Sequence, residues 1–91
     1  MTKEEKILQR LESLEPITTT LVDDSARHAG HAGARDGGSH FQLRIVSAQF
    51  SGKNTVARHR MIYSALGDMM KHDIHALNIL ALAPDESDLQ T

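Results

Sequence analysis

The segment Phe41-Gln-Leu-Arg-Ile45 sets the architecture, because its hydrophobic and polar residues alternate strictly. Alternation with a period of two is typical of a strand with one face in the core and the other in water. After a turn at 50–54, hydrophobic residues recur at helical spacing between Met61 and Met69, and a second strand-like segment occupies 74–82. This order of strand, helix and strand predicts a βαβ unit in which the two strands are parallel.

The residues before this unit add a helix and a third strand. Thr2 and Glu5 have the spacing of a capping box, and hydrophobic residues at helical spacing predict a helix over 3–14. Pro16 ends this helix, and a run rich in Thr, Ile and Val at 17–22 predicts a strand antiparallel to the strand that follows it. We therefore predict an α+β fold, in which a three-stranded mixed sheet carries one or two crossover helices and all helices cover one face.

The composition narrows the class of protein. The chain has 91 residues, six histidines, no cysteine and a formal net charge of -2. This length suits one small domain, which we place at 1–84, followed by an acidic flexible tail at 85–91. Without cysteine the chain has neither disulfides nor thiolate ligands, and its charge is not that of a general nucleic-acid binder. Its apolar runs are too short to span a membrane, and its N-terminal residues are too acidic for a targeting peptide, so we expect a cytoplasmic protein.

The predicted topology brings histidines from distant parts of the sequence to one end of the sheet. Parallel strands begin at the same end, so His40 and His75 lie at neighbouring strand starts. The long glycine-rich loop between the first two strands carries His28 and His31 and enters the sheet at that end too. We therefore consider His31 and His75 as a pair of metal ligands, with His28 as a further candidate, because imidazole is the commonest protein metal ligand.

Simpler roles for these histidines stay open. His75 shares its predicted face with Leu77 and is also consistent with a strand-end histidine bonded to a carbonyl group. His31 is also consistent with a solvated residue of the loop. His40 is predicted to point to the side opposite Phe41, where a surface role is favoured over metal ligation.

The other end of the βαβ unit is basic. Lys53, Arg58 and Arg60 are either ordinary solvated charges or contacts to phosphate groups, because arginine forms bidentate pairs with phosphate. The tetrapeptide Gly30-His-Ala-Gly33 matches the Gly-x-x-Gly loop of KH domains only weakly, because it lies between two predicted strands and not between helices. The sequence contains neither paired carboxylates in a predicted cleft nor a nucleotide-binding fingerprint, so we do not expect an enzyme.

Six short motifs, in order and at these spacings, resemble the BolA family of small proteins. The resemblance covers residues 3–84, and its specificity comes from the combination of the motifs. The motifs are Ala29-Gly-His31-Ala, Ser39-His-Phe41, Ile45-Val-Ser47, Phe50-x-Gly52, Arg58-His-Arg60 and Ile74-His-Ala-Leu77.

The resemblance implies an αββααβ fold similar to type II KH domains and a partnership with a monothiol glutaredoxin. In that partnership a [2Fe–2S] cluster bridges the two proteins, in iron–sulfur trafficking or iron regulation. The two cluster ligands of the family fall on His75 and His31, so the chain resembles the subclass with a histidine in the loop. The glutaredoxin cysteine and a bound glutathione would supply the sulfur ligands, and two imidazoles on one iron is a Rieske-like arrangement. The chain alone would hold no cluster.

The resemblance also implies an alternative function. Some family members are transcriptional regulators of stress, morphology or biofilm responses, and they are thought to bind DNA through a helix-turn-helix-like region that corresponds to 50–66. Lys53, Arg58 and Arg60 would then be the contacts, and the net negative charge predicts weak, salt-sensitive binding. The sequence leaves open whether the protein without its partner forms a weak homodimer.

Overall fold

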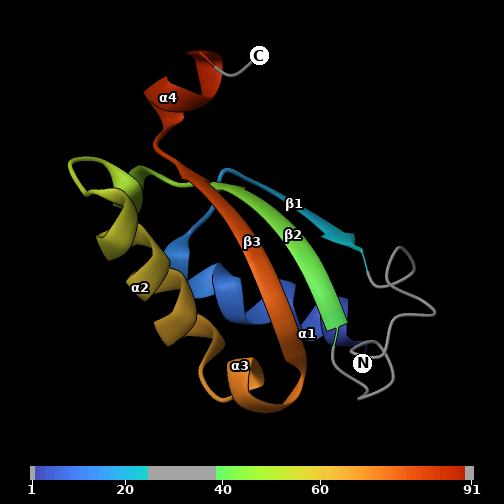
Figure 1. The fold of residues 1–91 in the computed structure, drawn as a ribbon. Coiled ribbons are helices and arrows are strands. Elements are labelled where there is room, and N and C mark those ends of the chain that lie inside the picture. Colours follow the sequence, from blue (N-terminus) through green and yellow to red (C-terminus); the bar gives the residue numbers. More distant parts are fainter. Residues whose placement is uncertain (1, 25–38, 90–91) are drawn as a thin grey trace.

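The computed structural model describes residues 2–24 and 39–89, and residues 1, 25–38 and 90–91 lie outside the description. Between the longer elements the chain makes short 3₁₀ turns at Glu12–Leu14 and Ala48–Phe50. The longer elements (Figure 1), in chain order, are α1 (Lys3–Leu11), β1 (Thr18–Asp23), β2 (Ser39–Val46), α2 (Thr55–Leu66), α3 (Met69–His72), β3 (Ile74–Leu82) and α4 (Pro84–Leu89).

The sheet has the predicted topology. Its strand order is β1-β2-β3, with β2 in the centre. β1 runs antiparallel to β2, so that Leu21 lies opposite Leu43, and β3 runs parallel to β2, so that Leu77 lies opposite Phe41. Figure 1 shows α1 and α2 on the same side of this sheet. The α+β class and the mixed three-stranded sheet are therefore confirmed.

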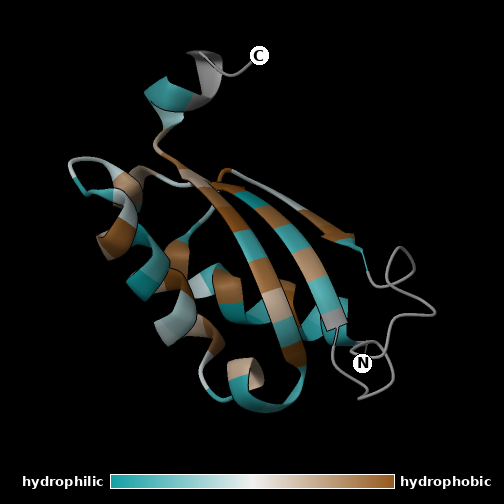
Figure 2. Cartoon of the chain, viewed as in Figure 1, coloured by the Kyte–Doolittle hydropathy of each residue, from teal (hydrophilic) through white to brown (hydrophobic). Residues whose placement is uncertain are grey.

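The core lies between the sheet and the two longer helices. Phe41, Leu43 and Ile45 of β2 are at most 2% exposed, whereas Gln42 between them is exposed. Figure 2 shows the resulting bands of alternating hydropathy along β2 and β3. Because each fully buried aliphatic or aromatic side chain contributes about 1.5–3 kcal/mol, this alternation fixes which face of the sheet the helices cover. The helices α1, α2 and α3 contribute buried side chains to this core, namely Ile7, Leu11, Ile62, Leu66 and Met69.

The helix boundaries follow from local hydrogen bonds. The predicted capping box is present: the Glu5 N–H donates to Thr2 Oγ1 at 3.1 Å, and the Thr2 N–H donates to Glu5 Oε1 at 3.1 Å. These bonds from Thr2 hold the pKa of the Glu5 carboxyl below its ordinary range. At α2 the Asn54 side chain accepts the Ala57 N–H at 2.9 Å, and Gly67, at a φ of 58°, ends the helix in a conformation that favours glycine.

The C-terminal segment differs from the sequence prediction. A flexible tail was expected from residue 85, but Pro84–Leu89 forms the short helix α4 after β3. The Ala83 N–H donates to Glu86 Oε1 at 2.9 Å, which holds the first turn of α4 against the end of the strand. The structure thus adds a helix that the sequence analysis did not predict, while the flexibility of residues 85–91 stays a prediction. None of the described helices is long and apolar enough to cross a membrane.

Candidate functional site

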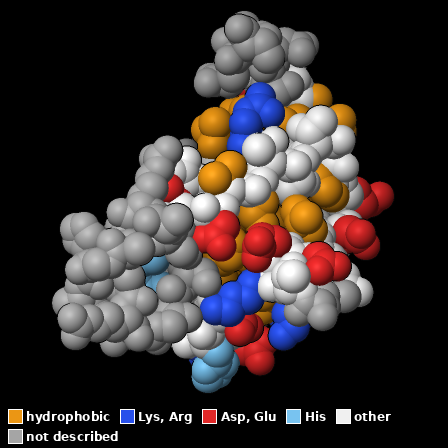
Figure 3. Space-filling model, turned by 90° about the vertical axis from the view of Figure 1, so that its right-hand side faces the viewer, with side chains coloured by type: hydrophobic (Ala, Val, Ile, Leu, Met, Phe, Trp, Pro, Cys, Tyr) orange, Lys and Arg blue, Asp and Glu red, His pale blue; other side chains and the backbone are white. Residues whose placement is uncertain are grey.

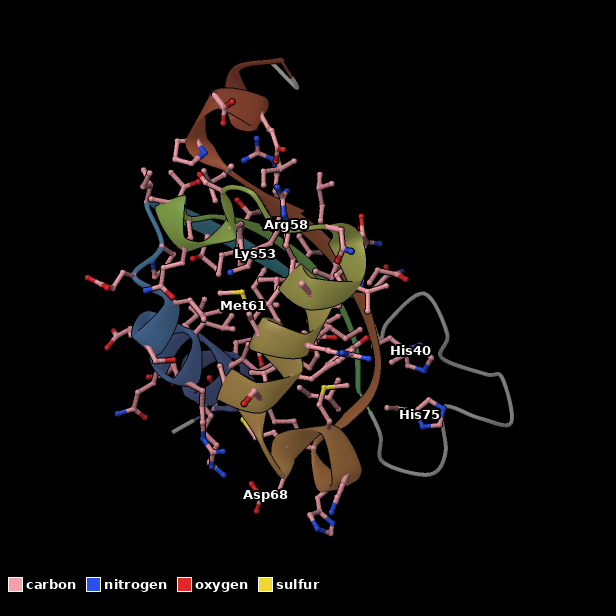
Figure 4. The ribbon with its side chains drawn as sticks, turned by 90° about the vertical axis from the view of Figure 1, so that its left-hand side faces the viewer. His40, Lys53, Arg58, Met61, Asp68 and His75 are labelled. Atoms are coloured by element: carbon pink, nitrogen blue, oxygen red, sulfur yellow. The ribbon has the colours of Figure 1, made fainter. Side chains whose placement is uncertain are left out.

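The topology brings two histidine rings together at the start of the parallel strand pair. His40 is the second residue of β2 and His75 is the second residue of β3. Their ring centroids lie 5.1 Å apart, and the ring planes are tilted by 36°. His75 is exposed and His40 is half-buried, and Figure 4 shows the two rings next to each other.

A β-bulge explains why His75 is exposed. Ser39 pairs with Ile74, but the next residue of β2, His40, pairs with Ala76, so that His75 is an extra residue in β3. Such a bulge interrupts the alternation of side chains along a strand. Ile74 is 3% exposed and Leu77 packs against the core, while both residues between them are exposed. The prediction that His75 shares the face of Leu77 is therefore wrong, and the bulge is the physical reason.

The other two predicted metal ligands, His31 and His28, lie outside the described residues, so their expected approach to His75 stays a prediction. The two described ends of this loop lie beside the histidine pair. The backbone N–H of Asp24 donates to the carbonyl oxygen of His40 at 2.7 Å, and Ser39 directly precedes His40. Within residues 2–24 and 39–89, no group of three or more His, Asp or Glu residues could hold a metal ion. The described part of this end of the sheet therefore contributes two imidazoles, those of His40 and His75.

The basic end of the strand pair is built differently. The Arg58 side chain is only 11% exposed, and its guanidinium forms a bidentate ion pair with the Glu86 carboxylate. The same guanidinium donates to the carbonyl oxygens of Lys53 at 2.8 Å and Ala81 at 2.9 Å. It therefore joins the start of α2, the end of β3 and α4 at one point.

This network shifts the pKa values of both partners away from neutrality. The hydrogen bonds from Arg58 and from the Ala83 N–H lower the pKa of Glu86 from 4.5 to about 2. The hydrogen bond to Glu86 in turn raises the pKa of Arg58. Both groups are thus charged throughout the physiological range, and the pair is a structural clamp between α2 and α4.

The three residues predicted to contact nucleic acid differ in whether they are already bonded within the protein. Arg58 is engaged with protein acceptors, so a phosphate would have to displace Glu86 to reach it. Lys53 and Arg60 are exposed. Figure 4 places Lys53 and Arg58 well apart from the two labelled histidines. The opposite side of the molecule, shown in Figure 3, carries both acidic and basic side chains and no extended surface of one sign.

The sequence analysis did not identify Glu86 as the ion-pair partner of Arg58, because Glu86 lies in the segment expected to be flexible. A signal was present in Pro84-Asp85-Glu86. Proline favours the first position of a helix, and acidic residues favour the first turn, where they meet the positive end of the helix dipole. Reading this tripeptide as a helix start would have placed Glu86 in an ordered element.

The comparisons with known proteins agree with this architecture. Residues 11–86 match the family model described as BolA-like protein. The SufE-like protein 1, chloroplastic/mitochondrial, of Arabidopsis thaliana is 47% identical over 87 residues, which are 89% of this chain and 24% of that protein. The DNA-binding transcriptional regulator BolA of Escherichia coli is 39% identical over 74 residues, covering 80% of this chain and 68% of that protein.

The solved structures include one that is similar over nearly the full length of both chains. BolA1 from Arabidopsis thaliana matches with a TM-score of 0.80 and 36% identity, over 94% of this chain and 96% of that one. The chain thus belongs to the BolA-like family. It spans only about a quarter of the SufE-like relative, so the activity of that longer protein is not carried over with the fold.

Proposed function

We propose that this chain is an adaptor that partners a monothiol glutaredoxin and shares a bridging [2Fe–2S] cluster with it, in iron–sulfur trafficking or iron regulation. The observation that carries the proposal is the exposed imidazole of His75, which the β-bulge lifts out of the alternating face of β3. A ligand to a cluster shared between two proteins must be accessible to the partner, and His75 meets this requirement.

The donor set also supports the proposal. The chain has no cysteine, so any sulfur ligand must come from outside it. His75 would supply one imidazole, and His31, the histidine of the loop, would supply the second, with His28 as its competitor. The cluster itself supplies electron-transfer or cluster-donor chemistry, and this chain contributes neutral nitrogen ligands. Because a protonated imidazole cannot ligate a metal, acidification should favour loss of the cluster.

The proposal is tested by reconstitution. The chain is mixed anaerobically with a monothiol glutaredoxin, glutathione, iron and sulfide, and the visible circular dichroism spectrum is recorded. We expect His75→Ala and His31→Ala to lose the spectrum of the mixed complex, while His72→Ala, an exposed histidine at the end of α3, keeps it. An unchanged spectrum in both of the first two variants would remove the ligand assignment.

A second function, DNA binding at 50–66, is favoured by one observation: the Escherichia coli relative is named a DNA-binding transcriptional regulator. Lys53 and Arg60 are exposed on this region, and they are the contacts we propose. Arg58 would join them only if its ion pair with Glu86 opened. Each lost phosphate contact should lower the salt slope of DNA binding by about one. Absence of binding at low salt would exclude this function.

The proposed location is the cytoplasm, as the composition suggests. A relative carries a chloroplastic/mitochondrial name, so the location needs its own test. A fluorescent fusion of the full-length protein in its host should give diffuse cytoplasmic signal, and an organellar signal would overturn this part of the proposal.

A further inference from the structure

The pairing of His40 with His75 suggests a second kind of metal chemistry at the histidine end of the sheet. The sequence assigned His40 a surface role, yet its ring lies 5.1 Å from that of His75, centroid to centroid. The two rings come from adjacent strands, and Figure 4 shows them side by side, across β3 from α2 and α3. Both rings are at least partly exposed to solvent.

The separation of the rings suits one particular coordination geometry. With metal–nitrogen bonds of about 2.0 Å, two imidazoles at tetrahedral positions have centroids about 5 Å apart, whereas two at right angles have centroids about 4.5 Å apart. The observed 5.1 Å fits the tetrahedral value. Rotation about the Cβ–Cγ bond of histidine leaves the ring centroid nearly in place, so one nitrogen of each ring can be directed toward a shared ion, while the other nitrogen can keep a hydrogen bond, as is usual for a metal-bound histidine.

The backbone around the pair is fixed before any ion arrives. The ladder between β2 and β3 runs on both sides of the bulge, from Ser39 and Ile74 to Val46 and Leu82. The carbonyl oxygen of His40 also accepts the Asp24 N–H at 2.7 Å, which ties β2 to the end of β1. Ligands on strands of one sheet are held more precisely than ligands on loops. The second imidazole therefore binds as an intramolecular ligand once the first is bound, which raises the overall affinity.

We propose that His40 and His75 form a two-imidazole site for a single divalent ion of the zinc class. The ion would occupy this site when no glutaredoxin is bound. Neutral imidazole is a good ligand for Zn²⁺, and water would complete the tetrahedron. The described residues offer no third protein ligand, so the site is open and exchangeable. Because His75 is a ligand in both proposals, zinc at this site would compete with the cluster for His75. The zinc site itself does not require that the protein bind a cluster.

The test is a calorimetric titration of Zn²⁺ alone into the full chain at neutral pH, without glutaredoxin or glutathione. We expect one exchangeable zinc site, and we expect His40→Ala and His75→Ala each to weaken it by about tenfold or more, because each leaves a single imidazole. The double variant should be little weaker than either single variant. His72→Ala, which removes an exposed histidine outside the pair, should bind as the unmodified chain does.

Three results would overturn the site. They are unchanged zinc affinity in His40→Ala, loss of affinity in His72→Ala, and absence of zinc binding by the unmodified chain. A titration of His31→Ala tests whether zinc binds in the loop instead. If His31→Ala abolishes zinc binding and His40→Ala does not, the assignment of the site to His40 and His75 is wrong. Amide NMR spectra of each variant confirm folding, and His40→Gln replaces His40→Ala should that variant unfold. The cluster proposal is tested separately, by the circular dichroism spectrum of the mixture reconstituted with glutaredoxin.

Discussion

The two ends of the parallel strand pair use their charged and polar residues in opposite ways. At the end of β3, the Arg58 guanidinium is nearly covered and bonded to Glu86 and to two backbone carbonyl groups. At the start of β3, a bulge leaves His75 at the surface beside His40. A charge taken from water requires partners, and an arginine that has them is part of the scaffold. At the histidine end the fold instead leaves the side chain of His75 exposed.

The largest expected effect is a difference in unfolding free energy between two single-residue deletions in β3, one at the bulge and one near the other end of the strand. Removing His75 deletes the extra residue of the bulge and restores a regular alternation of Ile74, Ala76 and Leu77, so the fold should survive. Removing Leu80 instead shifts the residues that follow to the opposite faces of the strand, takes Ala81 from the face that packs against the core, and should cost about 1–3 kcal/mol of unfolding free energy. Urea unfolding measures both. Equal losses for the two deletions would mean that the bulge is needed for folding.

An intermediate effect is expected from the two arginines of the basic end. Arg58→Ala removes the clamp between α2 and α4 and should lower the unfolding free energy by about 1–2 kcal/mol, because hydrogen bonds to charged groups are lost at a partly exposed site. Arg60→Ala, an exposed residue of the same helix, should change it by less than about 0.5 kcal/mol. Thermal or urea unfolding gives both values. If Arg60→Ala were the more destabilising, the assignment of Arg58 to the scaffold would be incorrect.

The smallest expected effect is a pH dependence from the clamp. The pKa of Glu86 falls from 4.5 to about 2 in the folded protein, so the folded state favours the carboxylate. Its contribution to stability is therefore present above about pH 4.5 and is lost as the pH falls toward 2. Unfolding curves at several pH values should show a shallower acid destabilisation in Glu86→Gln than in the unmodified chain. Parallel curves would show that Glu86 is not clamped in solution.

Much of this fold could be predicted from its sequence, because hydrophobic spacing reports directly which face of an element is buried. The strand at Phe41–Ile45, the capping box at Thr2 and the strand at Ile74–Leu82 all carry such local signals. The pairing of β3 parallel to β2 followed from the helix between them. These features need no information about distant side chains.

The features that were missed depend on contacts between distant segments. A bulge is a property of two paired strands, and the residues of β3 alone do not reveal that His75 is the extra one. The role of Arg58 depends on Glu86, which lies 28 residues later and in a segment that composition marked as a tail. The position of His31 relative to His75 stays a prediction of the topology. The sequence thus predicted that His40 and His75 lie at neighbouring strand starts, and it did not reveal the ion pair of Arg58 with Glu86.

The central claim is that the exposed imidazole of His75 ligates iron in a complex with glutaredoxin, and nitrogen spectroscopy tests it most directly. The chain is labelled with ¹⁵N-histidine, reconstituted with unlabelled glutaredoxin and glutathione, and the reduced cluster is examined by pulsed electron paramagnetic resonance. The account predicts strong couplings from two ¹⁵N nuclei, with one of them lost in His75→Ala. A reduced cluster without any strong ¹⁵N coupling, or one whose couplings are unchanged in His75→Ala, would contradict the account.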